Sequence, residues 1–184
     1  MPKSTIPDCA TYIVLDIPDP MAGRIRSIRA KFDPDRSSMP AEITVTGSSG
    51  TGQLVPGQSL EQVAAEIDRI AGLFPPFLAE FGKVERFPDT DIYFLELLDP
   101  RPFEAIQKAL AESSIRFLPN PYPFHPHCTL KLRSAPSDPE LLELLFLDAP
   151  KEPFTLSSLS LYALPDVRSC KRLCTAKLRG PCGP

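Results

Sequence analysis

Residues 124–132 read Phe-His-Pro-His-Cys-Thr-Leu-Lys-Leu and contain both histidines of the 184-residue chain. In a β-strand successive side chains point to opposite faces, so this segment predicts His127, Thr129 and Lys131 on one face. Histidine can exchange a proton near neutral pH, while the hydroxyl and the ammonium group donate hydrogen bonds or positive charge. This combination is typical of a site that holds a phosphate group.

A second segment, residues 42–46, repeats this pattern with one substitution. It reads Glu-Ile-Thr-Val-Thr, so Glu42 occupies the position that His127 has in the later copy, and Thr44 corresponds to Thr129. The two segments therefore predict two related strands, of which only the later one carries an imidazole.

The residues around both segments follow the same order in each half of the chain. In the first half, apolar periodicity and proline boundaries predict a strand, a helix, the Glu42 strand, a second helix and a strand, at residues 12–17, 21–32, 42–46, 59–74 and 77–87. In the second half they predict a strand, a helix, the His127 strand, a further helix and two closing strands, at residues 92–98, 103–110, 127–132, 138–145, 154–164 and 171–178. An internal duplication explains this order. We therefore expect one domain over residues 1–184, built of two pseudo-symmetric lobes at about 1–90 and 91–184.

Two further patterns resemble functional motifs but have simpler interpretations. The polar face of the helix at 21–32 carries four basic residues, Arg24, Arg26, Arg29 and Lys31, and we expect this face to be solvated. Residues 47–54 have the glycine spacing of a phosphate-binding loop, but Gln53 replaces the lysine and Leu54 replaces the hydroxyl residue. We therefore expect a flexible surface loop at this position.

Composition limits the class of protein. The net charge of −3 and the pI of about 5.4 argue against non-specific binding of nucleic acid over the whole surface, although a local basic cleft stays open. The first 30 residues lack an apolar stretch of signal-peptide length, and no run of about 18 apolar residues occurs, so we expect a cytoplasmic protein without a membrane partner. Cys170, Cys174 and Cys182 lack the paired spacing of zinc sites, and we expect reduced thiols.

The layout resembles the two-histidine (2H) phosphoesterases, the superfamily of 2′,5′-RNA ligase and cyclic nucleotide phosphodiesterase. The resemblance covers nearly the whole chain and rests on Pro126-His127-Cys128-Thr129-Leu130 as the second motif, on Leu161-Tyr162 in the penultimate strand, and on the opening strand with its prolines. It implies an α+β fold in which two antiparallel sheets face each other across a central cleft, with helices outside. Each sheet would contribute one motif, and a pseudo-twofold axis would relate the two.

The resemblance also implies a reaction. In such enzymes both motif histidines contact one phosphate, and they act as general base and general acid. The two threonine hydroxyls hold the non-bridging oxygens, and neither a metal nor another cofactor is needed. The substrate or ligand would be a nucleotide or an RNA terminus, and the activity that of a cyclic phosphodiesterase, a hydrolase.

Glu42 departs from the family's pattern because it stands where the first histidine is expected. An ionised carboxylate repels a phosphate and cannot donate a hydrogen bond to it. His125 would lie on the same face as His127 if the strand extended back through Pro126, and it could then compensate. The first motif is therefore expected to be degenerate.

Three hypotheses stay open at this point. The first is a diverged phosphoesterase in which His127 and Glu42 are catalytic and the activity is weak or altered. The second is a catalytically inactive module that holds a nucleotide or an RNA end with Thr44, Thr129, His127, His125 and Lys131, while Tyr122 and Phe124 stack a base. The third is a structural role, in which Glu42 and His127 form a polar pair.

Overall fold

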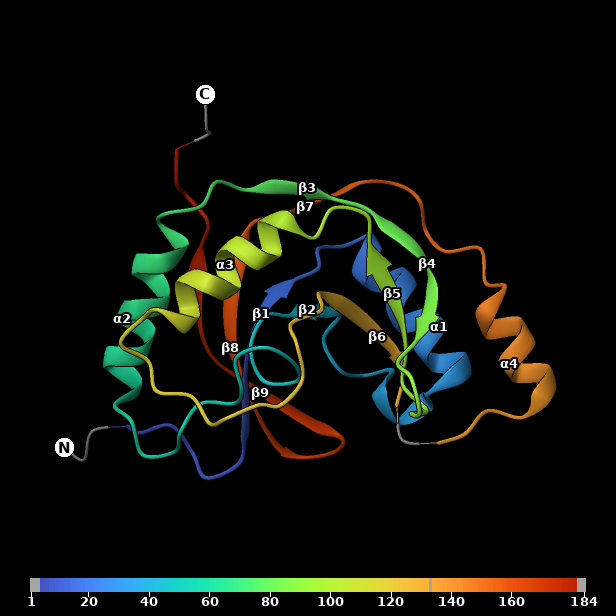
Figure 1. The fold of residues 1–184 in the computed structure, drawn as a ribbon, viewed down its shortest axis with the longest axis horizontal. Helices are drawn as coiled ribbons and strands as arrows, with labels where there is room; N and C mark the ends of the chain where they lie inside the picture. The colour runs from blue at the N-terminus through green and yellow to red at the C-terminus, as the bar shows by residue number, and fades with distance from the viewer. Residues whose placement is uncertain (1–3, 133, 182–184) are drawn as a thin grey trace.

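The computed structural model describes residues 4–132 and 134–181 and has an α+β architecture (Figure 1). The strands span Ala10–Asp16 (β1), Glu42–Thr44 (β2), Phe77–Ala79 (β3), Phe81–Arg86 (β4), Tyr93–Leu97 (β5), His127–Lys131 (β6), Phe154–Leu156 (β7), Ser158–Asp166 (β8) and Ser169–Lys177 (β9). They form a four-stranded sheet of order β2-β1-β8-β9, a three-stranded sheet of order β4-β5-β6 and a two-stranded sheet of β3 and β7. All pairings of these named strands are antiparallel, as the resemblance implies.

Each of the two larger sheets combines strands from both halves of the sequence. The strand β4 of the first half joins β5 and β6, and the strands β8 and β9 of the second half join β1 and β2. The order β2-β1-β8 in one sheet thus corresponds to β6-β5-β4 in the other. In both sheets the motif strand pairs with the opening strand of its own half, which pairs in turn with a strand from the other half.

The register of the motif strands repeats as well. In one sheet Asp16 lies opposite Glu42, and in the other Glu96 lies opposite His127. Two residues further along each motif strand, Thr44 lies opposite Val14 and Thr129 lies opposite Phe94. The two motifs therefore occupy equivalent places in their sheets, which supports the internal duplication.

The motif strands lie in the middle of each half in chain order but not in the middle of their sheets. Both β2 and β6 lie at an edge of their sheet, and the two strands contact each other. An edge strand can approach the edge of a second sheet, whereas a central strand is enclosed by its two neighbours. The edge positions are therefore what brings the two motifs together.

The helices span Met21–Phe32 (α1), Leu60–Ala71 (α2), Arg101–Ala111 (α3) and Asp138–Leu145 (α4), and a 3₁₀ turn (η1) spans Pro34–Arg36. The first helix packs against β6, α2 against β8 and β9, and α4 against β4 (Figure 1). The hydroxyl of Ser59 accepts a hydrogen bond from the N–H of Gln62 at the start of α2. This helix ends at Ala71, three residues before the predicted end at Phe74.

Two expectations from composition concern membrane-spanning segments and the cysteines. Among the residues that the structure describes, no helix has the length and apolar character that crossing a bilayer requires. Cys170 and Cys174 carry free thiols, while Cys182 lies outside the described residues.

Candidate active site

A cavity of about 880 Å³ opens between the two larger sheets. Most of the residues singled out in the sequence line it, namely Glu42, Thr44, Tyr122, His125, His127 and Thr129. The two motifs thus meet at one cleft, as their equivalent positions in the duplicated halves predict.

His127 is a buried, neutral imidazole with one ring nitrogen committed to the backbone. Its Nδ1 lies 2.6 Å from the carbonyl oxygen of His125, and a carbonyl can only accept, so Nδ1 carries the proton. The other nitrogen, Nε2, is then unprotonated, and no hydrogen bond to it is recorded among the described residues. Burial lowers the pKa of His127, and the nearby charge of Arg36 acts in the same direction. The geometry therefore presents a lone pair that can take a proton.

Two aromatic rings hold the histidines in place. The ring centroids of Phe87 and Phe94 lie 4.2 Å apart, and both rings meet His127 edge-on, at 4.9 and 5.2 Å. The same two phenylalanines meet the ring of His125, which lies 6.2 Å from that of His127. His125 lines the cleft although β6 begins only at His127, so the predicted extension of the strand is not what brings it there.

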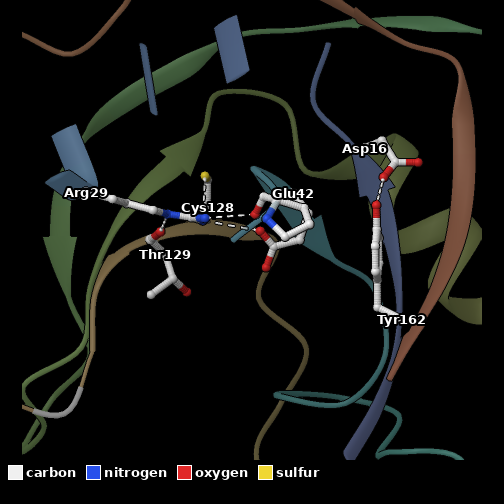
Figure 2. A network of polar contacts seen from close by, with 7 residues as sticks. Asp16, Arg29, Glu42, Cys128, Thr129 and Tyr162 are labelled. Atoms are coloured by element: carbon white, nitrogen blue, oxygen red, sulfur yellow. Dashed lines mark hydrogen bonds and ion pairs between the residues drawn. The ribbon is translucent and has the colours of Figure 1, made fainter. Parts of the chain in front are cut away.

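Glu42 is the partner of a buried arginine on α1 (Figure 2). The guanidinium of Arg29 donates to Glu42 at 3.2 Å, to the carbonyl oxygen of Thr129 at 2.9 Å and to that of Pro40 at 2.8 Å. Burial by itself lowers the pKa of Arg29, but the Glu42 carboxylate and the Cys128 sulfur together more than offset this, so the pKa is raised. Arg29 therefore links α1, β2 and β6 as a permanently charged group.

The expected solvated face of α1 is wrong at Arg29, whose side chain is 0% exposed. The neighbouring Arg24 and Lys31 do lie on the exposed side of the helix. The helical pattern alone cannot distinguish these positions, because the burial of Arg29 depends on β6 and β2 covering one flank of α1. Acceptors on those strands offset the desolvation of the charge.

The third hypothesis, a polar pair of Glu42 and His127, is also wrong. The carboxylate is held by Arg29, and the imidazole by the backbone of residue 125. The carboxylate opposite Glu42, that of Asp16, has a separate set of donors: the hydroxyls of Ser158, Ser160 and Tyr162. Separate donors for Asp16 and Glu42 offset the repulsion expected between like charges on paired strands.

Lys131 does not share the cleft face with His127 and Thr129, contrary to the sequence prediction. Its Nζ donates to the carbonyl oxygen of Phe32 at 2.7 Å and lies 3.3 Å from the carboxylate of Glu140. The register explains this: Phe94 lies opposite Thr129 but Tyr93 lies opposite Lys131, so β6 has one extra residue at this point. Such a bulge breaks the alternation of side chains.

Phe124 is not part of the cleft lining either, because its ring packs against the hydrophobic core. The glycine-rich segment lies beside it and is less exposed than predicted, since Gly47, Ser49 and Gly52 are buried. At Gly47 φ is +119° and an added Cβ would lie 2.0 Å from a ring carbon of Tyr12. Close packing of the backbone therefore explains the glycine at this position without a phosphate loop.

The cleft residues that sequence reasoning did not assign to the site include Arg36, Tyr162 and Cys170. The hydroxyl of Tyr162 donates to Asp16 at 2.8 Å (Figure 2). It also accepts a hydrogen bond from Nε of Arg172 at 2.9 Å. Burial, and then the charge of Asp16, raise the pKa of Tyr162, so its hydroxyl stays protonated. In the sequence, Tyr162 was noted only as part of the penultimate strand and Cys170 only as a reduced thiol, and neither signal indicated a place in the cleft.

The two sheets, the cleft between them and the repeated motifs define a duplicated phosphoesterase-type fold. The family model described as the 2′-5′ RNA ligase superfamily matches residues 17–167, which is more than half of the chain. The chain therefore belongs to this superfamily, and the resemblance drawn from the sequence is confirmed.

Solved structures show the same fold at low sequence identity. The crystal structure of TT0787 of Thermus thermophilus is 18% identical, covers 93% of this chain and 98% of its own, and has a TM-score of 0.66. E. coli LigT complexed with 3′-AMP is 18% identical over 92% of this chain and 98% of its own, with a TM-score of 0.63. The same E. coli protein complexed with phosphate is 17% identical over 92% and 96%, with a TM-score of 0.59. No curated protein matches the chain.

Proposed function

We propose that this chain is a diverged phosphoesterase whose cleft binds the phosphate of a nucleotide or an RNA terminus and slowly opens a 2′,3′-cyclic phosphate. The observation that carries the proposal is the state of His127, a neutral imidazole with Nδ1 bound to the backbone and Nε2 left to a ligand in the cleft. Thr44 and Thr129 would hold the non-bridging oxygens from the two sides, and Tyr122 at the rim would stack on the base. The proposal needs no metal.

The step would begin with water. Nε2 of His127 takes a proton from the water as its oxygen bonds to phosphorus, and the bond from phosphorus to one ribose oxygen breaks. That leaving oxygen needs a proton, which the family's first histidine would supply. Here Glu42 stands in its place and is held by Arg29, so the proton comes from solvent. The missing acid is the reason to expect slow turnover.

One observation favours a second candidate, a module that binds without turnover. The carboxylate of Glu42 is an ion-pair partner of Arg29, which withdraws it from acid–base chemistry while leaving the cleft open. Such a module would bind the same nucleotide or RNA end with the same threonines and with His127 as an acceptor.

The two candidates are separated by one assay with two readouts. Hydrolysis of 2′,3′-cyclic AMP and binding of 3′-AMP by calorimetry are measured for the wild type, His127→Ala and His127→Gln. The glutamine variant is the matched control, because its amide can still donate to the carbonyl of residue 125 but cannot take a proton. Turnover in the wild type that both variants lose supports the enzyme, whereas binding without turnover supports the module. A wild type that neither binds nor hydrolyses overturns both.

A further inference from the structure

Arg36 is a cleft residue with an unmatched donor. It ends the turn η1 between α1 and β2, and its side chain lines the cavity beside the first motif. Its Nε is buried, and it meets no acceptor among residues 4–132 and 134–181. No ion pair of Arg36 is recorded in that part of the chain either. A buried donor without a partner is costly, so this arrangement is expected to be completed by a ligand.

A comparison with Arg29 shows what Arg36 lacks. Arg29 donates to two carbonyl oxygens and to the Glu42 carboxylate, which lies within hydrogen-bond distance of Arg29 and not of Arg36. Burial lowers the pKa of Arg36, and the neighbouring charge of Arg29 adds to this, while Glu42 acts in the opposite direction. A guanidinium nevertheless stays charged at neutral pH. Arg36 is therefore a fixed cation, close to Glu42, that still has donors to offer.

We propose that Arg36 holds the phosphate group in the cleft and supplies the positive charge that the missing first-motif histidine would have supplied. The inference rests on the proposed function and names the group that binds the anion. A guanidinium can donate two parallel hydrogen bonds to phosphate oxygens, and it is well suited to this ligand. The neutral His127 and the hydroxyls of Thr44 and Thr129 supply no charge of their own.

This substitution of one cation for another has a chemical consequence. Histidine both attracts a phosphate and can give a proton to the leaving oxygen, whereas arginine attracts it but does not release a proton at neutral pH. Arg36 therefore restores the affinity of the cleft for phosphate without restoring acid catalysis. The cleft is expected to bind nucleotide phosphates well and to turn them over slowly.

The test compares two arginines that differ in location. Dissociation constants for 3′-AMP and for inorganic phosphate are measured by calorimetry for the wild type, Arg36→Gln, Arg36→Lys and Arg101→Gln. Arg101 is exposed, pairs with Asp99 and lies outside the cleft lining, so Arg101→Gln changes the net charge from −3 to −4 as Arg36→Gln does. Thermal unfolding of each variant is followed in parallel.

Arg36→Gln is expected to weaken 3′-AMP binding by about 10- to 100-fold, since a hydrogen bond between charged groups is lost, while Arg101→Gln changes it by less than about twofold. Arg36→Lys is expected to lie between them, because a lysine keeps the charge but not the paired donors. If Arg36→Gln binds as the wild type does, the inference is overturned and the proposed function stands. If the wild type binds neither probe, both are overturned.

A second measurement keeps the inference testable should Arg36→Gln not fold. In ¹⁵N-labelled wild-type protein the Nε–H resonance of Arg36, assigned by its loss in Arg36→Lys, is followed during titration with inorganic phosphate. We expect this resonance to shift in parallel with saturation, because Nε is the donor without an acceptor among the described residues. A resonance that stays in place at saturation overturns the inference.

Discussion

The two motif strands line opposite walls of the cleft, here called the β6 wall and the β2 wall, and their titratable side chains differ in what they bind. His127 on the β6 wall keeps one ring nitrogen free of recorded hydrogen bonds among the described residues, whereas Glu42 on the β2 wall is bound by another side chain. On β6, His127 is held by a backbone carbonyl through one nitrogen and keeps the other. On β2, Glu42 is bound by Arg29, which also donates to β6. The strands β2 and β6 occupy equivalent places in the two sheets, but their motif side chains have different hydrogen-bond partners. In the proposed function, His127 on β6 carries the proton chemistry, while Glu42 on β2 helps to join the two sheets through Arg29.

The largest effect is expected on the β6 wall. His127→Gln should lower turnover of 2′,3′-cyclic AMP by roughly 10²–10⁴-fold, the range for the loss of one general base. Steady-state kinetics with calorimetry of 3′-AMP binding will show whether turnover falls while affinity is largely kept. An unchanged turnover in folded protein would remove His127 from the mechanism.

The next effect concerns stability and the β2 wall. Glu42→Ala leaves the fully buried Arg29 with two carbonyl oxygens and the sulfur of Cys128 but without an anionic partner. We therefore expect a loss of about 3 kcal/mol in the free energy of unfolding. Urea denaturation measures this loss, and the double variant Glu42→Ala with Arg29→Met should recover part of it, since no charge is then left unpaired. A loss below about 1 kcal/mol would mean that the pair contributes little to joining the sheets.

Restoring the histidine tests the difference between the walls directly. In protein that remains folded, Glu42→His should raise turnover of 2′,3′-cyclic AMP by about 10²-fold, because it returns an acid to the leaving oxygen. The variant also removes the carboxylate from Arg29, so its activity is compared per folded molecule at a temperature below its unfolding transition. Turnover equal to that of the wild type would show that the cleft has lost more than one histidine.

The smallest effect is a dependence of stability on pH. Burial lowers the pKa of His127 in the folded state, so below pH 6.5 the unfolded chain binds a proton that the folded chain does not. The free energy of unfolding is therefore not reduced by His127 above pH 6.5. As the pH falls from 6.5 toward the lowered pKa, it decreases by about 1.4 kcal/mol per pH unit. Denaturation at several pH values should show a steeper acid loss for the wild type than for His127→Gln. Parallel curves would contradict the burial of a neutral imidazole.

Much of the site followed from local patterns. Alternation along a strand and the repeat of the motif placed Glu42, Thr44, His127 and Thr129 in equivalent positions, and the resemblance to the 2H phosphoesterases supplied the superfamily and the cleft between two sheets. These inferences hold because strand periodicity is a property of the backbone itself, and because a duplicated sequence folds into equivalent places.

Other features depended on contacts between distant segments. The same periodicity failed at Lys131, where a bulge against β5 turned the side chain toward Phe32 and Glu140. The helical pattern did not distinguish the buried Arg29 from the exposed basic residues of the same helix. Arg29 is buried because α1 packs on β6. A bulge and a covered helix flank are decided by the partner strand, which no local window contains.

The chain by itself therefore determined which side chains alternate, which segments repeat and which family the chain belongs to. The tertiary structure decided that the motif strands are edge strands that contact each other and that Glu42 forms an ion pair with Arg29. It also decided that Arg36 lines the cleft with an Nε donor that has no acceptor among the described residues. The physical reason is that periodicity reports the direction of a side chain along its own backbone. Burial and pairing of charge depend on what another part of the chain places against it.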